Sequence, residues 1–110
     1  MSYLIKPSIR KQVWSVINND PDFFSTILSY LDDKFHARDF YELFLLYLPQ
    51  KKGQLLMKEK RMDRRMWVVN YILPKLKEKK LAYLPVEEKH KKADKRFWQK
   101  GKEYIVRAVK

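Results

Sequence analysis

The 110-residue sequence contains no cysteine, only two glycines and five prolines. Without cysteine, the chain forms no disulfide scaffold, cysteine-based zinc finger, iron–sulfur centre or thiol nucleophile. Its longest apolar run, residues 43–48, is far shorter than the roughly 20 residues that span a bilayer. Residues 1–12 lack the apolar segment and cleavage site of a secretory signal. We therefore expect an intracellular protein, cytoplasmic or nucleoid-associated, without a membrane span.

Sequence motifs of enzyme chemistry are also missing. The sequence has neither of the common glycine-rich nucleotide-binding motifs and no His-Glu-x-x-His motif. Its two histidines, His36 and His90, stand far apart, and adjacent acidic pairs at 32–33 and 87–88 lie near expected helix ends, where they interact with the helix dipole. We expect a protein that is not an enzyme and has no catalytic residue, cofactor or metal site.

The chain is rich in apolar residues (45%) and in positive charge. Its length and apolar content predict one folded domain over residues 1–110. Residues 1–50 hold five basic and six acidic side chains, whereas residues 51–110 hold 20 basic and seven acidic ones, a net charge of +13. The electrostatic field of such a positively charged segment attracts polyanions, so it favours nucleic acid, an anionic membrane surface or an acidic protein as the partner.

Apolar residues at helical spacing predict three helices in the first half of the chain. Ser8 is the expected N-cap of the first helix. Asp20 as N-cap and Pro21 at the first helical position begin the second, over residues 20–35, and the third covers residues 37–48. The residues expected to be buried are Ile9, Val13, Val16, Ile17, Phe23, Phe24, Ile27, Leu28, Leu31, Phe40, Leu43, Phe44, Tyr47 and Leu48.

The basic half begins with a predicted turn at residues 50–53. A short helix over residues 53–61 and a long helical run over residues 62–81 follow it. Because Pro74 removes a backbone hydrogen bond inside the long run, we expect a kink near Asn70 or two separate helices. The residues expected to face inward are Leu55, Leu56, Met57, Met62, Met66, Val69, Leu73 and Leu76.

The C-terminal part allows two interpretations. Residues 81–86 have the composition of a short strand, and residues 96–110 that of a hairpin with its turn at Gly101. Alternatively, Pro85 at a first helical position and a glycine just past the end predict a helix over residues 85–100. The sequence thus predicts a mainly α fold with a small β-hairpin, or else an all-α fold.

From residue 37 onward, the expected order is helix, short helix, long helix, short strand, basic loop and strand. This order resembles that of winged helix-turn-helix DNA-binding domains, through the segments DFYELFLLYLP, QLLMKEKR, VVNYILPKLKEKKLAYL and RFWQKGKEYIVRA. The sequence departs from the usual pattern at Lys80, where glycine often ends the recognition helix, and in the long stretch 87–95. The resemblance implies a winged-helix unit over residues 37–110, preceded by helices within residues 1–36 that complete the core or form a homodimer.

The resemblance implies a transcriptional regulator or architectural protein that binds duplex DNA through a recognition helix near residues 62–80 and a basic wing. The side of this helix opposite the apolar stripe presents the implied base contacts Arg64, Trp67, Asn70 and Tyr71. Arg64 matches guanine and Asn70 matches adenine. Core or dimer contacts are the alternative for Trp67 and Tyr71, and helix capping is the alternative for Asn70.

Phosphate contacts are expected from basic side chains around the recognition helix and in the wing. They are Lys51, Lys52, Lys58, Lys60, Arg61, Arg65, Lys92, Lys95, Arg96, Lys100 and Lys102. The run at residues 89–96 is either an extended wing or an exposed basic helix. RNA binding through the same surface is one alternative function. A non-catalytic adaptor or inhibitor that docks on an acidic protein partner is another.

Overall fold

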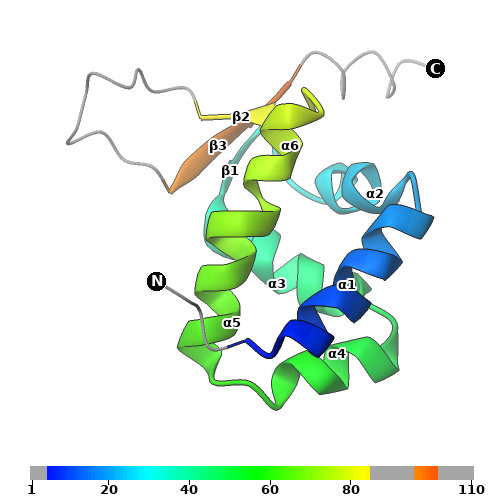
Figure 1. Ribbon diagram of the computed structural model, residues 1–110. Helices are drawn as coiled ribbons and strands as arrows, with labels where there is room; N and C mark the ends of the chain where they lie inside the picture. The colour runs from blue at the N-terminus through cyan, green and yellow to red at the C-terminus, as the bar shows by residue number, and fades with distance from the viewer. Residues whose placement is uncertain (1–4, 85–95, 102–110) are drawn as a thin grey trace.

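The computed structural model describes residues 5–84 and 96–101. Helices make up most of it, and a small antiparallel sheet lies at the end of the molecule where α6 ends (Figure 1). The elements are α1 (Pro7–Asn19), α2 (Phe23–Ser29), β1 (Lys34–His36), α3 (Ala37–Tyr47), α4 (Gln50–Met57), α5 (Arg61–Trp67), the π-helical turn η1 (Val68–Ile72), α6 (Pro74–Glu78), β2 (Ala82–Tyr83) and β3 (Phe97–Lys100). The mainly α fold with a small β component is confirmed, and the all-α alternative is wrong.

Helix α1 forms where the apolar spacing predicts it. Its N-cap is Lys6, however, so the predicted cap at Ser8 is wrong. The helix starts at Pro7 instead. An N–H group in the first turn has no acceptor within the helix, so proline, which lacks this group, is favoured there. The predicted buried stripe is confirmed at Ile9, Val13 and Ile17, with Val16 half-buried beside it.

Helix α2 is shorter than predicted at both ends. The Asp20 side chain accepts a hydrogen bond from the Asp22 backbone N–H at 3.0 Å, and this local turn delays the helix to Phe23. The helix ends at Ser29, because residues 34–36 pair with β3 instead of continuing it. Its predicted buried face is confirmed at Phe23, Phe24, Ile27 and Leu28.

Helix α3 begins directly after β1. The His36 side chain caps it, since its Nδ1 accepts a hydrogen bond from the Arg38 backbone N–H at 2.9 Å. The predicted inner face is confirmed at Phe40, Phe44 and Leu48, and it also includes Tyr41. A short strand therefore leads straight into a helix, and it places Arg38 in the first helical turn.

The predicted turn at residues 50–53 is wrong. These residues form the start of α4, for which Pro49 is the N-cap, and the Gly53 N–H donates a helical hydrogen bond to the Pro49 carbonyl at 2.9 Å. Pro49 ends α3 but leaves the following residues free to begin a helix. In α4 only Leu56 is fully buried, whereas Met57 is 54% exposed and does not face inward as predicted.

The predicted long helix is interrupted by a π-helical turn. The Leu73 N–H donates to the Val68 carbonyl at 2.8 Å, five residues earlier in the chain. This wide turn comes immediately before Pro74, which has no N–H to donate. The interruption expected near Asn70 is therefore confirmed, and it takes the form of the π turn η1 between α5 and α6.

The inward face of this segment differs from the prediction. Met62 and Met66 are 64% and 39% exposed, whereas the buried residues are Trp67, Val68, Ile72, Leu73 and Leu76. The π turn contains one residue more than an α turn, so a regular spacing counted back from Leu73 selects the wrong face of α5. Burying Trp67 also removes more apolar surface from water than burying either methionine.

Helix α6 ends in a Schellman motif. Lys80 has a left-handed φ of 60° and donates its N–H to the Lys77 carbonyl at 3.1 Å. The Leu81 N–H donates to the Leu76 carbonyl at 2.8 Å, and both leucines are buried, as is typical of this motif. The turn directs the chain from α6 into β2.

The sheet has the strand order β1-β3-β2, with both pairs antiparallel. Phe35 of β1 lies opposite Trp98, and Tyr83 of β2 lies opposite Gln99. The strand expected within residues 81–86 is confirmed at β2, and the first arm of the predicted hairpin at β3. The sequence did not predict β1, because three residues are too few for a strand periodicity to be recognised.

Part of the C-terminal predictions lies outside the described residues. The alternative helix over residues 85–100 is wrong at residues 97–100, which form β3. Its remaining part, at residues 85–95, and the second hairpin arm, within residues 102–110, are not among the described residues.

One core joins the N-terminal helices to the rest of the chain. Phe23 of α2 meets Phe44 of α3 edge-on, with ring centroids 5.5 Å apart, and Trp14 of α1 meets Trp67 of α5 at 6.5 Å. The apolar faces of α1 and α2 thus complete the core, which is one of the two roles expected for them. None of the helices within residues 5–84 and 96–101 has both the length and the apolar character of a bilayer span.

Candidate nucleic-acid interface

A groove of about 350 Å³ lies between the start of α3 and the exposed side of α5 and η1. Its lining includes His36, Arg38, Met62, Arg65, Met66, Val69, Asn70 and Arg96. We call it the arginine groove. It draws its side chains from three separate parts of the chain.

Backbone pairing brings two of the arginines together. The Ala37 N–H at the start of α3 donates to the Arg96 carbonyl at 2.7 Å, and His36 lies opposite Phe97 in the ladder between β1 and β3. Arg96 and Arg38 therefore lie at one site although 58 positions separate them in the sequence. Helix α5 adds Arg65 from the other side of the groove.

The floor of the arginine groove is partly apolar. Met62, Met66 and Val69 line it, and Met62 is among the most exposed large apolar residues of the described chain. Methionine is flexible and polarizable, so it adapts to flat or irregular ligand surfaces. Exposed apolar side chains surrounded by arginines indicate a binding surface more than an ordinary solvated helix face.

The charge of the arginine groove has one sign. None of its described lining residues is acidic. Arginine stays protonated in proteins and presents a planar set of N–H donors that fits phosphate and carboxylate groups in a bidentate manner. Three such groups around an apolar floor can bind an anion that also has an apolar or aromatic part.

The arginine groove is a cationic cleft assembled by the pairing of β1 with β3 and by the exposed side of α5. No protein-family model, curated protein or solved structure matches this chain. Its function has to be inferred from the chemistry of this groove and from the charge of the surrounding surface.

The residues predicted to contact bases lie in different surroundings. Asn70 is exposed and lines the arginine groove, and its neighbour Tyr71 is 46% exposed. Trp67 is 2% exposed and packs against Trp14, so its predicted base contact is wrong. The π turn is the reason, because it rotates Trp67 from the expected outer face of the helix into the core.

Arg64 and Lys52 hold elements of the fold together. The Arg64 guanidinium donates from Nε to the Tyr41 hydroxyl at 2.9 Å and from Nη1 to the Glu59 carbonyl at 2.8 Å. The Lys52 ammonium donates to Oε1 of Gln12 at 2.7 Å and so links α4 to α1. Their predicted DNA contacts stay predictions, and each side chain also has a structural role.

The other predicted phosphate contacts divide into four groups. Exposed side chains around α4 and the start of α5 are Lys51, Lys58, Lys60 and Arg61, and the arginine groove contains Arg65 and Arg96. Lys100 is 8% exposed, so its predicted position at an exposed wing tip is wrong; it ends β3, the central strand of the sheet. Lys92, Lys95 and Lys102 lie outside the described residues.

Sequence reasoning missed several residues of the arginine groove, among them Arg38, Met62 and Met66. Arg38 belongs to the nearly neutral half of the sequence, and only the pairing of β1 with β3 connects it to the basic half. Met62 and Met66 were predicted to face inward. Pro74 was the available signal, since a π turn is one way for a helix to accommodate a proline, and such a turn moves the buried stripe by one residue.

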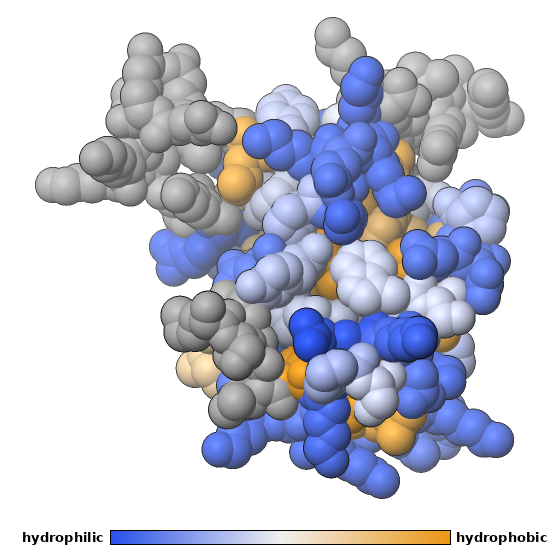
Figure 2. All heavy atoms as spheres, in the orientation of Figure 1, coloured by the Kyte–Doolittle hydropathy of each residue, from blue (hydrophilic) through white to orange (hydrophobic). Residues whose placement is uncertain are grey.

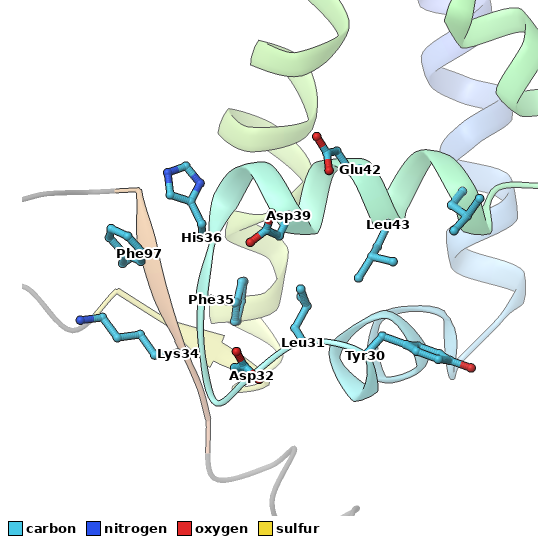
Figure 3. A pocket seen from close by; sticks show the side chains of 11 residues that line it. Tyr30, Leu31, Asp32, Lys34, Phe35, His36, Asp39, Glu42, Leu43 and Phe97 are labelled. Carbon is cyan, nitrogen blue, oxygen red and sulfur yellow. The ribbon is translucent and has the colours of Figure 1, made fainter.

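A second groove, of about 660 Å³, shares His36 with the arginine groove but carries the opposite charge (Figure 3). Asp39 and Glu42 of α3 and Asp32 before β1 line this acidic groove and outnumber Lys34, the one lysine in its described lining. Within residues 5–84 and 96–101, no three His, Asp or Glu side chains come close enough together to hold a metal ion. The surface therefore changes sign across His36, and a polyanion is favoured on one side of it only.

Proposed function

We propose that this protein binds duplex DNA through the arginine groove and the adjoining basic surface of α4 and α5. The proposal depends on the convergence of Arg38, Arg65 and Arg96 on one groove without an acidic lining residue among the described ones. Guanidinium groups from three segments of the chain give an anion several N–H donors at one place. A basic surface needed only for solubility does not require arginines from three segments to meet.

The groove offers both kinds of DNA contact. Its arginines bind phosphate oxygens, and the exposed Lys58, Lys60 and Arg61 extend the phosphate-binding surface. Asn70 lines the groove and is the residue that we propose for the edge of an adenine, and the methionines would offer apolar contact to a base or sugar. Phosphate contacts would supply most of the affinity, while Asn70 and its neighbours would supply base preference.

The order of elements supports a winged helix-turn-helix interpretation. The short helix α4, the long segment from α5 to α6, β2 and β3 follow one another as expected for such a domain. Residues 84–96, where the basic wing is expected, connect two antiparallel strands, β2 and β3. The corresponding role is that of a transcriptional regulator or an architectural protein, in the cytoplasm or at the nucleoid.

A salt titration of duplex DNA binding tests the proposal. A labelled random duplex is titrated from about 50 to about 300 mM salt with the intact protein, Arg38→Ala and Arg65→Ala. Each variant should lower the slope of log affinity against log salt by about one, as expected for the loss of one phosphate contact. Arg10→Ala on α1, exposed and outside the groove, removes the same charge and should leave the slope unchanged.

Two outcomes would contradict duplex binding at this site. One is the absence of binding at the lowest salt concentration, and the other is an equal effect of Arg10→Ala and Arg65→Ala. Stronger competition by single-stranded RNA than by duplex DNA would favour the RNA-binding alternative.

The exposed methionines favour a second candidate, an acidic protein partner. Met62 and Met66 lie next to arginines, an arrangement that fits a helix with one apolar and one acidic face. Met62→Gln and Met66→Gln should then weaken the binding of a synthetic acidic amphipathic peptide and leave the salt slope for duplex DNA unchanged. A change in the salt slope alone would count against this candidate.

A further inference from the structure

Exposed apolar side chains gather at the two grooves that meet at His36. The described residues include eight large hydrophobic side chains that are exposed, and five of them line one groove or the other. These five are Met62 and Met66 in the arginine groove and Tyr30, Leu46 and Phe97 in the acidic groove. By contrast, hydrophilic side chains gather over α6, near the top of the face shown in Figure 2. Exposed apolar residues collected among charged ones are typical of a protein interface.

Helix α3 contributes charges of both signs to this surface. Arg38, in its first turn, is exposed and lines the arginine groove. Asp39 and Glu42 are also exposed, and they line the acidic groove (Figure 3). Leu46 of the same helix lines the acidic groove too and is 75% exposed. Neither carboxylate forms an ion pair within residues 5–84 and 96–101. The outer side of α3 is therefore acidic and apolar, with a basic group at its beginning.

A surface with a positive and a negative half side by side is complementary to a copy of itself. A rotation of 180° about an axis through the boundary at His36 brings the acidic groove of one copy over the arginine groove of the other, and the reverse contact forms as well. The exposed methionines of the arginine groove fit a helix with one apolar and one acidic face, and the outer side of α3 has this character. A second copy of the chain therefore matches the arginine groove in charge and in apolar surface.

We propose that two copies of this chain form a dimer in which the arginine groove of each copy faces the acidic groove of the other. Arg38 of one copy then lies against Glu42 of the other, and the symmetry makes this contact twice. Exposed ion pairs contribute little affinity by themselves, so the burial of the five apolar side chains supplies most of it, and the charges fix the orientation. The second copy covers Arg38 and Arg65, and it therefore competes with duplex DNA for the arginine groove.

Sedimentation equilibrium of the full chain at about 150 mM salt tests the proposal, because the repulsion between two chains of net charge +12 is then screened beyond about 8 Å. The wild-type protein should pass from monomer to dimer with a Kd in the micromolar range. Arg38→Glu and Glu42→Arg each create two contacts between like charges in the dimer, and each should weaken it at least about tenfold. Arg10→Glu on α1, exposed and outside both grooves, makes the same charge change as Arg38→Glu and should alter the Kd less than about twofold.

A mixture of the two variants gives the sharpest result. In a dimer of one Arg38→Glu chain and one Glu42→Arg chain, both contacts again join opposite charges, so an equimolar mixture should dimerise within about threefold of the wild-type affinity. Circular dichroism of each variant alone checks that it is folded.

Three outcomes would overturn the proposal. The wild-type chain could stay monomeric up to about 1 mM, which would leave the two grooves to a different partner. The two variants could each dimerise like the wild-type protein, which would place the interface elsewhere, or their mixture could stay monomeric. The measurement contains no nucleic acid, so a failure of duplex binding at the arginine groove would not affect it.

Discussion

At Gly101 the end of the central strand passes so close to the end of α6 that no side chain fits. A Cβ on this residue would overlap the Lys80 carbonyl oxygen and lie 3.1 Å from the carbonyl carbon. The Gly101 N–H donates to the Leu81 carbonyl at 2.8 Å, which fixes the approach. The sequence suggested a turn or a helix end for this glycine, but its role is to let two backbone segments meet.

The two glycines of the chain should respond to alanine in opposite directions. Gly101→Ala should destabilise the protein by about 1–3 kcal/mol, because the backbone must move apart to admit the methyl group. Gly53→Ala should stabilise it by about 0.5–1 kcal/mol, since Gly53 lies inside α4 and a Cβ there would meet no atom closer than 3.8 Å. Urea unfolding measures both changes, and a Gly101→Ala variant at least as stable as the wild-type protein would contradict the packing described at Gly101.

A pair of tyrosines gives a prediction about pH. The rings of Tyr30 and Tyr47 lie 5.5 Å apart, and a side-chain hydrogen bond with Tyr30, reinforced by desolvation, raises the pKa of Tyr47 above its usual range. Tyr30→Phe should therefore lower the pKa of Tyr47, which a pH titration of tyrosinate absorbance would detect. Tyr83→Phe is the control, since it removes one tyrosine without touching this pair.

The direction in which stability changes with pH follows from the raised pKa of Tyr47. The stabilising contribution of the Tyr47 hydrogen bond is present while its hydroxyl is protonated, and it is lost as the pH rises through the raised pKa. Tyr30→Phe should remove this contribution at neutral pH, so the variant should show less loss of stability between neutral and strongly alkaline pH than the wild-type protein. An unchanged tyrosinate titration in Tyr30→Phe would rule out the hydrogen bond as the cause.

At the level of secondary structure, helical spacing identified most of the helices, but it did not predict which face of α5 is buried. The buried faces of α1, α2 and α3 are local patterns, and the sequence predicts them correctly. The face of α5 depends on the π turn at Val68–Ile72, which no apolar periodicity reveals. One additional residue in a turn was enough to exchange the roles of Trp67 and Met66.

This rotation predicts contrasting stabilities for two variants of α5. Trp67→Ala should cost about 3–5 kcal/mol, since it removes a 2% exposed side chain from the contact between α5 and α1. Met62→Ala should change stability by less than about 0.5 kcal/mol, because its side chain is exposed. Chemical denaturation of the two variants measures the change in the free energy of unfolding. A larger loss of stability in Met62→Ala than in Trp67→Ala would mean that α5 buries the face that the sequence predicted.

The arginine groove was only partly predictable. Arg65 and Arg96 belong to the basic half that the charge distribution indicated, and Asn70 was predicted from the winged-helix resemblance. Arg38 joins them through the pairing of β1 with β3, which connects residues about 60 positions apart. Such long-range pairs leave little local signal in a single sequence, so the convergence of the three arginines required the structure.

For the molecule as a whole, the hydrophobic core contains residues from both sides of residue 36. Its buried residues come from α1, α2 and β1 as well as from the helices and strands of the basic half. Removing residues 1–36 would expose the faces of α3 and α5 against which these elements pack, and β3 would lose one of its two partners. Residues 37–110 therefore depend on the N-terminal helices for their stability.

A fragment consisting of residues 37–110 should not fold by itself. The loss of a large part of the apolar burial exceeds the few kcal/mol by which a small domain is normally stable. We expect no cooperative thermal transition by far-ultraviolet circular dichroism, whereas the full chain should show one. A cooperative transition in the fragment would show that residues 1–36 are an accessory unit, available for dimerisation.

The position of β3 has a consequence for how the protein is made. The central strand of the sheet is the last described element to leave the ribosome, and β1 and β2 pair with it and not with each other. All the helices among the described residues can therefore emerge and pack before the sheet exists. Arg96, which the same pairing fixes beside α3, completes the arginine groove at that late stage. A nascent chain would thus acquire its helical core first and its complete cationic surface last.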